Sequence, residues 1–138
     1  MKTTFITAGF LAFGMLTLTL PAADAEEDAG AQVKPVFSDE LSNLPGQRLT
    51  AIVVNYAPGG KSSEHRHAGS VFAYVLSGEI RSQNSATGPA RVYKAGESFF
   101  EPAGSTHLIS ENASAGEPAS LLAVFVAEDG AHLTTFGK

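Results

Sequence analysis

The chain consists largely of short runs of β-branched and aromatic residues separated by glycine and proline, and this pattern constrains its fold most. Such runs favour extended backbone, and the glycines and prolines between them suit tight turns. After residue 25, no stretch keeps the 3.6-residue periodicity of an amphipathic helix and no internal repeat is present. We therefore predict an all-β fold. The expected strands span residues 49–56, 71–76, 79–83, 91–93, 98–100, 107–110 and 121–127.

The expected strand over residues 71–76 refines this prediction, because successive side chains of a strand point to opposite faces. One face carries small residues and the other carries large ones: Val71, Ala73 and Val75 against Phe72, Tyr74 and Leu76. Small residues suit the interior of a barrel, and large residues suit packing on a second layer or a second subunit. We therefore expect a sandwich, jelly roll or barrel, with a homodimer as a hypothesis.

The first 25 residues have the pattern of an export signal. Lys2 gives a positive start, residues 5–20 are mostly apolar, and residues 21–25 end in a small-x-small sequence. The apolar stretch is shorter than the roughly 20 residues that a membrane-spanning helix needs, which disfavours an anchor. We expect cleavage after Ala25, a periplasmic or secreted protein, and no membrane contact after cleavage.

Residues 26–46 are polar and interrupted by prolines and glycines, so they are expected to form a flexible leader and an N-terminal arm. Val33 and residues 36–37 could add an edge strand there. One domain over residues 47–138 then follows, because the remaining length suffices for a single hydrophobic core.

Charge and cysteine content exclude several classes of function. The chain has 9 lysines and arginines and 14 aspartates and glutamates, and its net charge is −5. The basic residues are scattered singly, which argues against a nucleic-acid partner and gives no polybasic patch for a membrane. The absence of cysteine rules out disulfides, thiol catalysis and thiolate metal sites.

Three histidines are the candidate metal ligands. His65 and His67 are two positions apart, which in extended backbone places both imidazoles on one face. His107 follows a Pro-Ala-Gly turn, where an antiparallel neighbour could return a third imidazole to the same ion. Three neutral imidazoles leave coordination positions open for water or substrate. Taken alone, however, the His-x-His spacing is weak evidence, because two ordinary surface histidines share it.

The residues around these histidines resemble the two sequence motifs of the cupin superfamily. The first motif is matched by Gly59, five residues, the His65-x-His67 pair and a strand that closes on Gly78. The second is matched by Gly96, Pro102, Gly104 and His107. Five, one and two residues lie between successive members, as in the motif. The resemblance implies a double-stranded β-helix jelly-roll barrel whose histidines point inward. It also implies one divalent transition-metal ion, which could be iron, manganese, nickel, zinc or copper.

The chain departs from the cupin pattern at one position. A glutamate usually stands after the second histidine, with three or four residues between them, and supplies a fourth ligand, but Val71 and Phe72 occupy those positions here. Val71 would present an apolar wall if it shares the facing of the two histidines. Three neutral imidazoles leave the ion's +2 charge uncompensated, which favours anionic or enolate-like ligands. Three-histidine cupins exist within the superfamily, among them oxygenases that cleave carbon–carbon bonds.

Glu101 is the candidate catalytic residue, because it lies six positions before His107, just before the turn. It could orient a histidine or a substrate, bind the metal directly, or act as a base. The alternative is a solvated carboxylate at the end of a strand. Glu64 and Arg66 have the opposite facing to the histidines and should point away, and His132 is expected in an exposed loop.

Two functions remain in competition at this stage. The first is an exported mononuclear metal-dependent enzyme, similar to a dioxygenase or an isomerase, that acts on a small oxygen-bearing organic substrate. The second is a non-catalytic module that binds or senses a small ligand or the metal. Both use the same barrel, and the sequence does not decide whether the protein is an enzyme.

Overall fold

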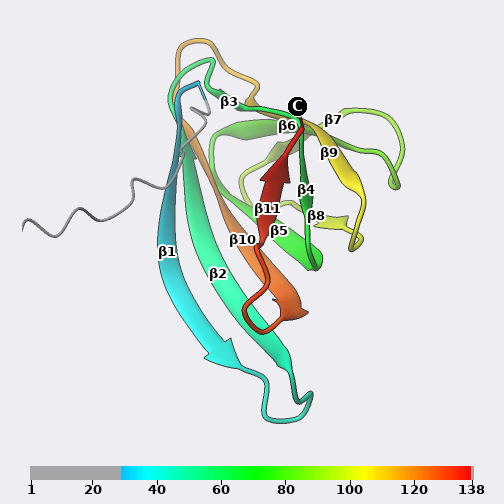
Figure 1. Ribbon diagram of the computed structural model, residues 1–138. Helices are drawn as coiled ribbons and strands as arrows, with labels where there is room; N and C mark the ends of the chain where they lie inside the picture. Colours follow the sequence, from blue (N-terminus) through cyan, green and yellow to red (C-terminus); the bar gives the residue numbers. More distant parts are fainter. Residues whose placement is uncertain (1–28, 138) are drawn as a thin grey trace, which may run out of the picture.

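A computed structural model describes residues 29–137 of the chain, and within them every regular element is a β-strand (Figure 1). The strands are β1 (Ala31–Glu40), β2 (Gln47–Tyr56), β3 (Lys61–Ser62), β4 (His65–His67), β5 (Ser70–Ser77), β6 (Glu79–Asn84), β7 (Arg91–Lys94), β8 (Ser98–Glu101), β9 (Thr106–Asn112), β10 (Ala119–Glu128) and β11 (Thr134–Phe136). The predicted all-β fold is confirmed. The expected export signal, residues 1–25, lies outside the described residues.

The strands form two antiparallel sheets. In the first sheet the order is β1-β2-β10-β5-β8, and in the second it is β11-β4-β9-β6-β7, with β3 also paired to β9. Figure 1 shows the long strands β1, β2 and β10 curving side by side, with β4, β9 and β6 across from them. This arrangement agrees with the expected jelly-roll barrel. No helix of residues 29–137 is long and apolar enough to cross a membrane.

All seven strands predicted from the sequence are present, with bounds that extend a few residues further. The N-terminal arm is a ten-residue edge strand, β1, paired with β2. Three strands were not predicted: β3, β4 and β11. Each has only two or three residues, which is too short for an alternating pattern to stand out.

The inner faces of the two sheets differ in chemistry. The buried apolar side chains come almost entirely from the first sheet: Ala51, Val54, Tyr56, Val71, Ala73, Val75, Ala119, Leu121, Ala123, Phe125 and Ala127. The buried polar side chains come almost entirely from the second sheet: His65, Ser82, Asn84, His107, Ser110 and Asn112. Two residues reverse the rule, since Ile80 is an apolar residue of the second sheet and Glu101 is a buried carboxylate of the first.

The predicted facing of β5 is confirmed, because its small residues are buried and its large ones are exposed. On the outer face, Phe72 is paired with Phe100 of β8, and these side chains are 45% and 51% exposed. Tyr74 of β5 is 39% exposed on the same face. The outside of the first sheet therefore presents large aromatic side chains to solvent.

Candidate metal centre

The three predicted histidines meet in the interior. They lie on the same face of two paired strands, β4 and β9. His65 of β4 is the direct antiparallel partner of His107 of β9, and His67 lies two residues further along β4. Their ligand nitrogens all lie within 4.8 Å of one another. His65 and His107 are buried and His67 is nearly so. The prediction that these residues come together is confirmed.

Main-chain carbonyls orient two of the rings. His65 Nδ1 donates to the Ser63 carbonyl at 2.6 Å, and His67 Nδ1 donates to the Leu133 carbonyl at 3.2 Å. A carbonyl can only accept, so in each ring the hydrogen is on Nδ1 and the lone pair is on Nε2. Hydrogen bonds of this kind are the usual way in which proteins hold a metal-binding imidazole in one tautomer.

The His67 imidazole is held in its neutral form. Burial lowers its pKa from 6.5 to about 4, with the neighbouring His65 adding to the effect, although the Glu101 carboxylate acts in the opposite direction. A neutral ring at physiological pH keeps the lone pair that a metal requires.

Glu101 lies beside two of the histidines. Its Oε2 is 3.1 Å from His107 Nδ1, its Oε1 is 3.9 Å from His67 Nε2, and Asn84 donates to it at 3.2 Å. Only 3% of the residue is exposed, so it is not a solvated strand-end carboxylate. Burial would raise the pKa of Glu101, but the close approach of His107, followed by His67 and Asn84, holds it below its ordinary value. The carboxylate is therefore ionised at neutral pH.

His107 provides the test of whether this cluster suits a metal. Its Nε2 lies 2.9 Å from the Ser82 hydroxyl. Its Nδ1 is buried and makes no aligned hydrogen bond to a described residue, although Glu101 is near enough for an ion pair. A buried polar atom without an aligned partner is costly. A divalent cation beside Nδ1 would satisfy both this nitrogen and the adjacent carboxylate, so the donor set fits a transition metal.

The register of β5 and β8 places Glu101 opposite Val71. Val71, which occupies one of the positions where the first motif usually has glutamate, is the direct cross-strand partner of Glu101. Paired residues of adjacent strands point to the same face with neighbouring Cβ atoms. Glu101 therefore reaches the histidines from β8, and Val71 on the adjacent strand β5 contributes the expected apolar wall.

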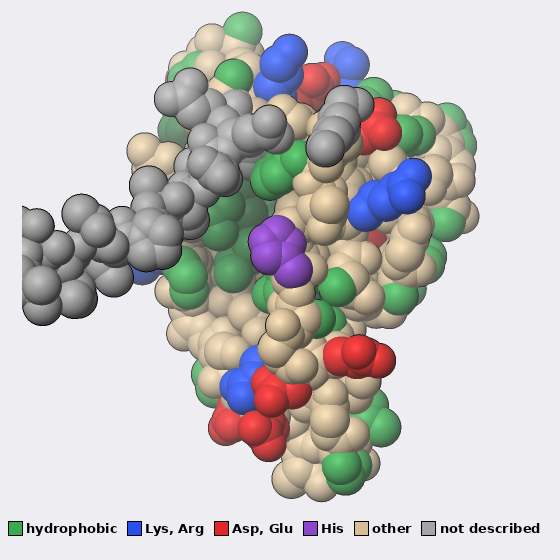
Figure 2. Space-filling model, viewed as in Figure 1, with side chains coloured by type: hydrophobic (Ala, Val, Ile, Leu, Met, Phe, Trp, Pro, Cys, Tyr) green, Lys and Arg blue, Asp and Glu red, His purple; other side chains and the backbone are tan. Residues whose placement is uncertain are grey.

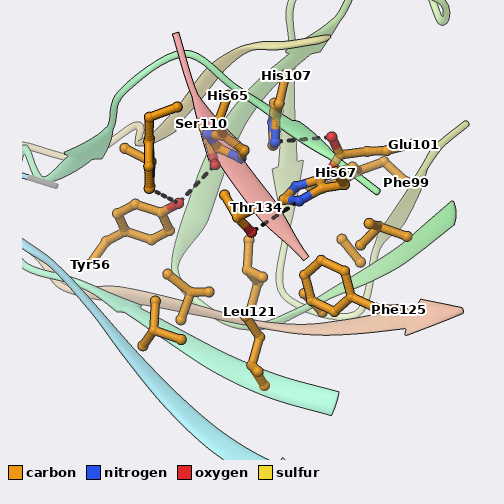
Figure 3. A pocket seen from close by; sticks show the side chains of 18 residues that line it. Tyr56, His65, His67, Phe99, Glu101, His107, Ser110, Leu121, Phe125 and Thr134 are labelled. Atoms are coloured by element: carbon orange, nitrogen blue, oxygen red, sulfur yellow. Dashed lines mark hydrogen bonds and ion pairs between the residues drawn. The ribbon is translucent and has the colours of Figure 1, made fainter. Parts of the chain in front are cut away.

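A cavity of about 270 Å³ opens beside the cluster. Figure 2 shows a hollow on this side of the molecule with hydrophobic side chains inside it. In Figure 3 the imidazoles and Glu101 lie on one side of the cavity and the Tyr56 ring lies on another. Leu121 lies on the wall below them, and Phe125 lies beside His67. The cavity thus joins the histidine cluster to a largely apolar chamber.

Three hydroxyl groups at the far side of the cavity were not predicted from the sequence. Tyr56 Oη lies 2.7 Å from Ser110 Oγ and 3.1 Å from Ser62 Oγ, and all three residues line the cavity. Strict alternation from His107 would turn Ser110 outward. An irregularity in the pairing of β9 with β6 places one extra residue after His107 and brings Ser110 back to the inner face. Nothing in the sequence marks this bulge.

The C-terminal strand β11 was also missed, and it completes the wall around two histidines. It pairs with β4, so that Thr134 lies opposite His67 and Phe136 lies opposite His65. Thr134 Oγ1 is 3.2 Å from His67 Nδ1, and the Phe136 ring centroid is 5.6 Å from that of His65. Three residues with a single phenylalanine carry too weak a signal for a strand to be predicted.

The remaining sequence candidates lie away from the cluster. Glu64 and Arg66 are exposed, as their facing on the strand predicted, and His132 is exposed in the loop before β11.

Comparisons with known proteins agree with this architecture. A cupin-like protein from Thermotoga maritima superposes with a TM-score of 0.62 at 20% identity, over 79% of this chain and 77% of that protein. An oxalate oxidase in complex with the substrate analogue glycolate gives 0.61 at 23% identity, over 83% and 59%. The DMSP lyase DddQ from Ruegeria pomeroyi DSS-3 gives 0.55 at 23% identity, over 64% and 42%. The chain therefore spans less than two thirds of either enzyme.

No curated protein sequence shows significant similarity to the chain. The sequence profile of the cupin domain, however, matches residues 52–125, which is more than half of the 138 residues and contains all three histidines and Glu101. The chain belongs to the cupin family.

Proposed function

We propose that this protein is an exported metal-binding cupin that acts on a small oxygen-bearing organic molecule. One divalent transition-metal ion would be held by His65, His67 and His107. The observation that carries the proposal is the cluster of three buried or nearly buried imidazoles, whose ligand nitrogens lie within 4.8 Å of one another at the edge of a cavity. When bound, such an ion supplies Lewis acidity toward oxygen atoms of a ligand.

Glu101 supplies, in this proposal, the negative charge that most cupins place on the neighbouring strand, which is β5 here. Its distances to His107 and His67 put it within reach of the same ion. A general base for neutral pH needs a pKa near 7, whereas the pKa of Glu101 is lowered. We therefore favour metal binding over proton transfer as its role. Replacing Glu101 with glutamine separates the two roles. Loss of metal affinity supports Glu101 as a metal ligand, and loss of turnover at unchanged metal affinity supports it as a general base.

The reaction class we favour is dioxygen-dependent cleavage or isomerisation of the bound molecule. Two structures with the same fold, an oxalate oxidase and a DMSP lyase, are enzymes that act on small molecules. The alternative is a non-catalytic binding module. It is favoured by one observation: the single carboxylate among the described cavity residues already contacts two histidines and Asn84.

Elemental analysis of protein purified from its native compartment tests the metal function. We expect about one equivalent of a transition metal per chain. Oxygen uptake should then be measured against β-dicarbonyls, catechols and flavonols. Metal without turnover supports the binding module, whereas a folded protein without stoichiometric metal contradicts the proposal.

We also propose a homodimer that pairs the outer faces of the first sheet. The exposed aromatic residues Phe72, Tyr74 and Phe100 support it, because adjacent large aromatic side chains are costly to leave in water. Light scattering should give twice the chain mass, and Phe72→Lys should give the monomer. A wild-type monomer at all concentrations would remove this part of the proposal.

Export is tested separately by N-terminal sequencing of the mature protein. A mature chain that begins at Glu26 supports the signal, and an intact Met1 in the native host argues against it.

A further inference from the structure

We infer that the ligand of this cavity has three parts: a pair of oxygens that binds the metal, an apolar body, and an uncharged hydrogen-bonding group that binds to Ser110. This inference rests on the proposed metal function and names the class of molecule that the site would accept. It follows from the arrangement of the cavity walls, which differ from one end to the other.

The wall of the cavity that the first sheet forms, from the histidine end onward, is lined by hydrocarbon. Val71, Ala73, Leu121, Ala123 and Phe125 of the first sheet form this part of the wall, and all five are buried. A polar group placed against them would lose its hydration without gaining a hydrogen bond. The body of a ligand that extends from the histidines must therefore be apolar.

The Ser110 hydroxyl can form a further hydrogen bond with a ligand. A hydroxyl has one proton to donate and two lone pairs to accept, and Ser110 Oγ is hydrogen-bonded to one group, Tyr56 Oη, at 2.7 Å. The Tyr56 hydroxyl holds Ser110 Oγ in place, and Ser110 lines the cavity. A ligand group that accepts or donates can bind there.

The charge of the cavity restricts that distal group to an uncharged one. Among the described residues that line the cavity there is no lysine or arginine, and the one carboxylate, Glu101, lies at the metal end. A carboxylate or phosphate at the far end would be desolvated without a cation to compensate it. A distal hydroxyl, carbonyl or ether has no such cost.

The backbone positions of His107 and Ser110 are separated by a length of strand that a small ring can span. His107 and Ser110 pair with Asn84 and Ser82, which are two residues apart on β6. Two residues of a strand correspond to about 7 Å. A six-membered ring with a chelating oxygen pair on one side and a substituent on the other has this reach.

Three hydroxypyranones that differ at one substituent test the inference. Kojic acid, allomaltol and comenic acid share one chelating head and carry a distal hydroxymethyl, methyl and carboxylate group respectively. Their affinities for the Zn²⁺-loaded protein should be measured by titration calorimetry. We expect kojic acid to bind roughly 3- to 10-fold tighter than allomaltol, as one neutral hydrogen bond predicts. Comenate should bind at least roughly tenfold more weakly than kojic acid.

Variants test whether the difference in affinity between kojic acid and allomaltol comes from the Ser110 hydroxyl. Ser110→Ala and Tyr56→Phe should each bring the kojic acid to allomaltol ratio close to one, while leaving the affinity for allomaltol nearly unchanged. Ser120→Ala and Tyr74→Phe remove the same hydroxyl groups outside the cavity and should leave the ratio as in the wild type. Two different variants with one expected result protect the test against a folding defect in either.

The outcomes separate this inference from the metal function. If all three probes bind with equal affinity, or if comenate binds most tightly, the metal site stands and the distal subsite is wrong. If the ratio survives both Ser110→Ala and Tyr56→Phe, the distal group binds elsewhere and the assignment to Ser110 is overturned. If the protein holds no zinc, the metal function fails and this inference fails with it. If it holds zinc but binds none of the probes, metal binding stands and this inference is overturned.

Discussion

The inner faces of the two sheets carry side chains of different polarity. The first sheet faces the interior with alanine, valine, leucine and phenylalanine, whereas the second faces it with histidine, serine and asparagine. Burial of apolar surface contributes roughly 25 cal/mol per Å², while a buried hydrogen bond contributes a net of only about 1 kcal/mol. The first sheet thus provides most of the stability, and the second provides most of the chemistry.

Glu101 and Tyr56 are where this division breaks down. Both belong to the first sheet, and both extend a polar group to the second, Glu101 toward His67 and His107 and Tyr56 toward Ser110. A wall that was purely apolar would leave the site with no carboxylate and no phenol. The comparison teaches that the site was built by placing two polar exceptions in an otherwise apolar sheet. The four predictions below test this division.

The largest effect should come from removing a histidine of the polar wall. His107→Ala takes away one of three nitrogen donors, and we expect metal affinity to fall by at least roughly a hundredfold, beyond what the loss of a supporting contact causes. Metal content after dialysis measures this. His132→Ala, which removes an exposed histidine, is the matched control and should retain full metal. Equal metal content in both variants would show that the ion lies elsewhere.

A cavity in the apolar wall should affect stability and leave the metal stoichiometry unchanged. Leu121 is 4% exposed, so Leu121→Ala should lower the free energy of unfolding by about 2 to 5 kcal/mol, as measured by urea denaturation. The neighbouring Leu122 faces outward and is only partly buried, and Leu122→Ala should cost less. Loss of metal from folded Leu121→Ala protein would contradict the division between the walls.

Acid should destabilise the metal-free protein through the polar wall. The pKa of His67 is lowered from 6.5 to about 4, so between these values the unfolded chain binds a proton that the folded chain does not. The free energy of unfolding should therefore fall by up to about 3 kcal/mol as the pH drops from 6.5 to 4, with no further loss from this group below 4. The lowered pKa of Glu101 acts in the same direction at lower pH.

Urea denaturation in the presence of a chelator, at several pH values, measures this change. The variant His67→Gln should flatten the dependence between pH 6.5 and 5. A wild-type stability that rises on acidification in this range would contradict the assignment of His67 as a buried neutral ring.

Moving the carboxylate to the strand where most cupins have it should have the smallest net effect. Glu101→Val alone should lower metal affinity by about 10- to 100-fold. Because Val71 and Glu101 are direct cross-strand partners, the double substitution Val71→Glu with Glu101→Val should recover most of that loss. Measuring the metal affinity of both variants and of the wild type shows whether the double substitution recovers the loss. A double variant no better than Glu101→Val would show that the position on β8 is required.

The sequence predicted the histidine cluster because regular alternation governs it. His65 and His67 share a face in any extended strand, and β9 carries His107 to the same place. Long strands such as β2 and β10 were predicted from a different signal, their runs of β-branched and aromatic residues between turns. Glu101 could be proposed but not oriented, because a residue at the end of a strand can turn either way. The cross-strand register with Val71 decided its direction.

The hydroxyl groups at the other end of the cavity could not be predicted in this way. Ser110 has the wrong parity relative to His107, and only the bulge in β9 turns it inward. Tyr56 is one large side chain in an apolar strand, and the sequence does not show that its hydroxyl meets a serine 54 residues away. Thr134 and Leu133 approach His67 through β11, which is only three residues long. Irregular pairing and long-range contacts account for what was missed.

The reach of Tyr56 across the barrel also bears on how sharply the native state is defined. Two layers that meet only through hydrocarbon can shift against each other at little cost, because apolar contact has no preferred direction. The hydrogen bond between Tyr56 and Ser110 joins the sheets at one end of the cavity, and the contact of Glu101 with His107 joins them at the other. Together they fix one alignment of the layers. A chain without both should stay compact yet lose the narrow amide resonances of a single conformer.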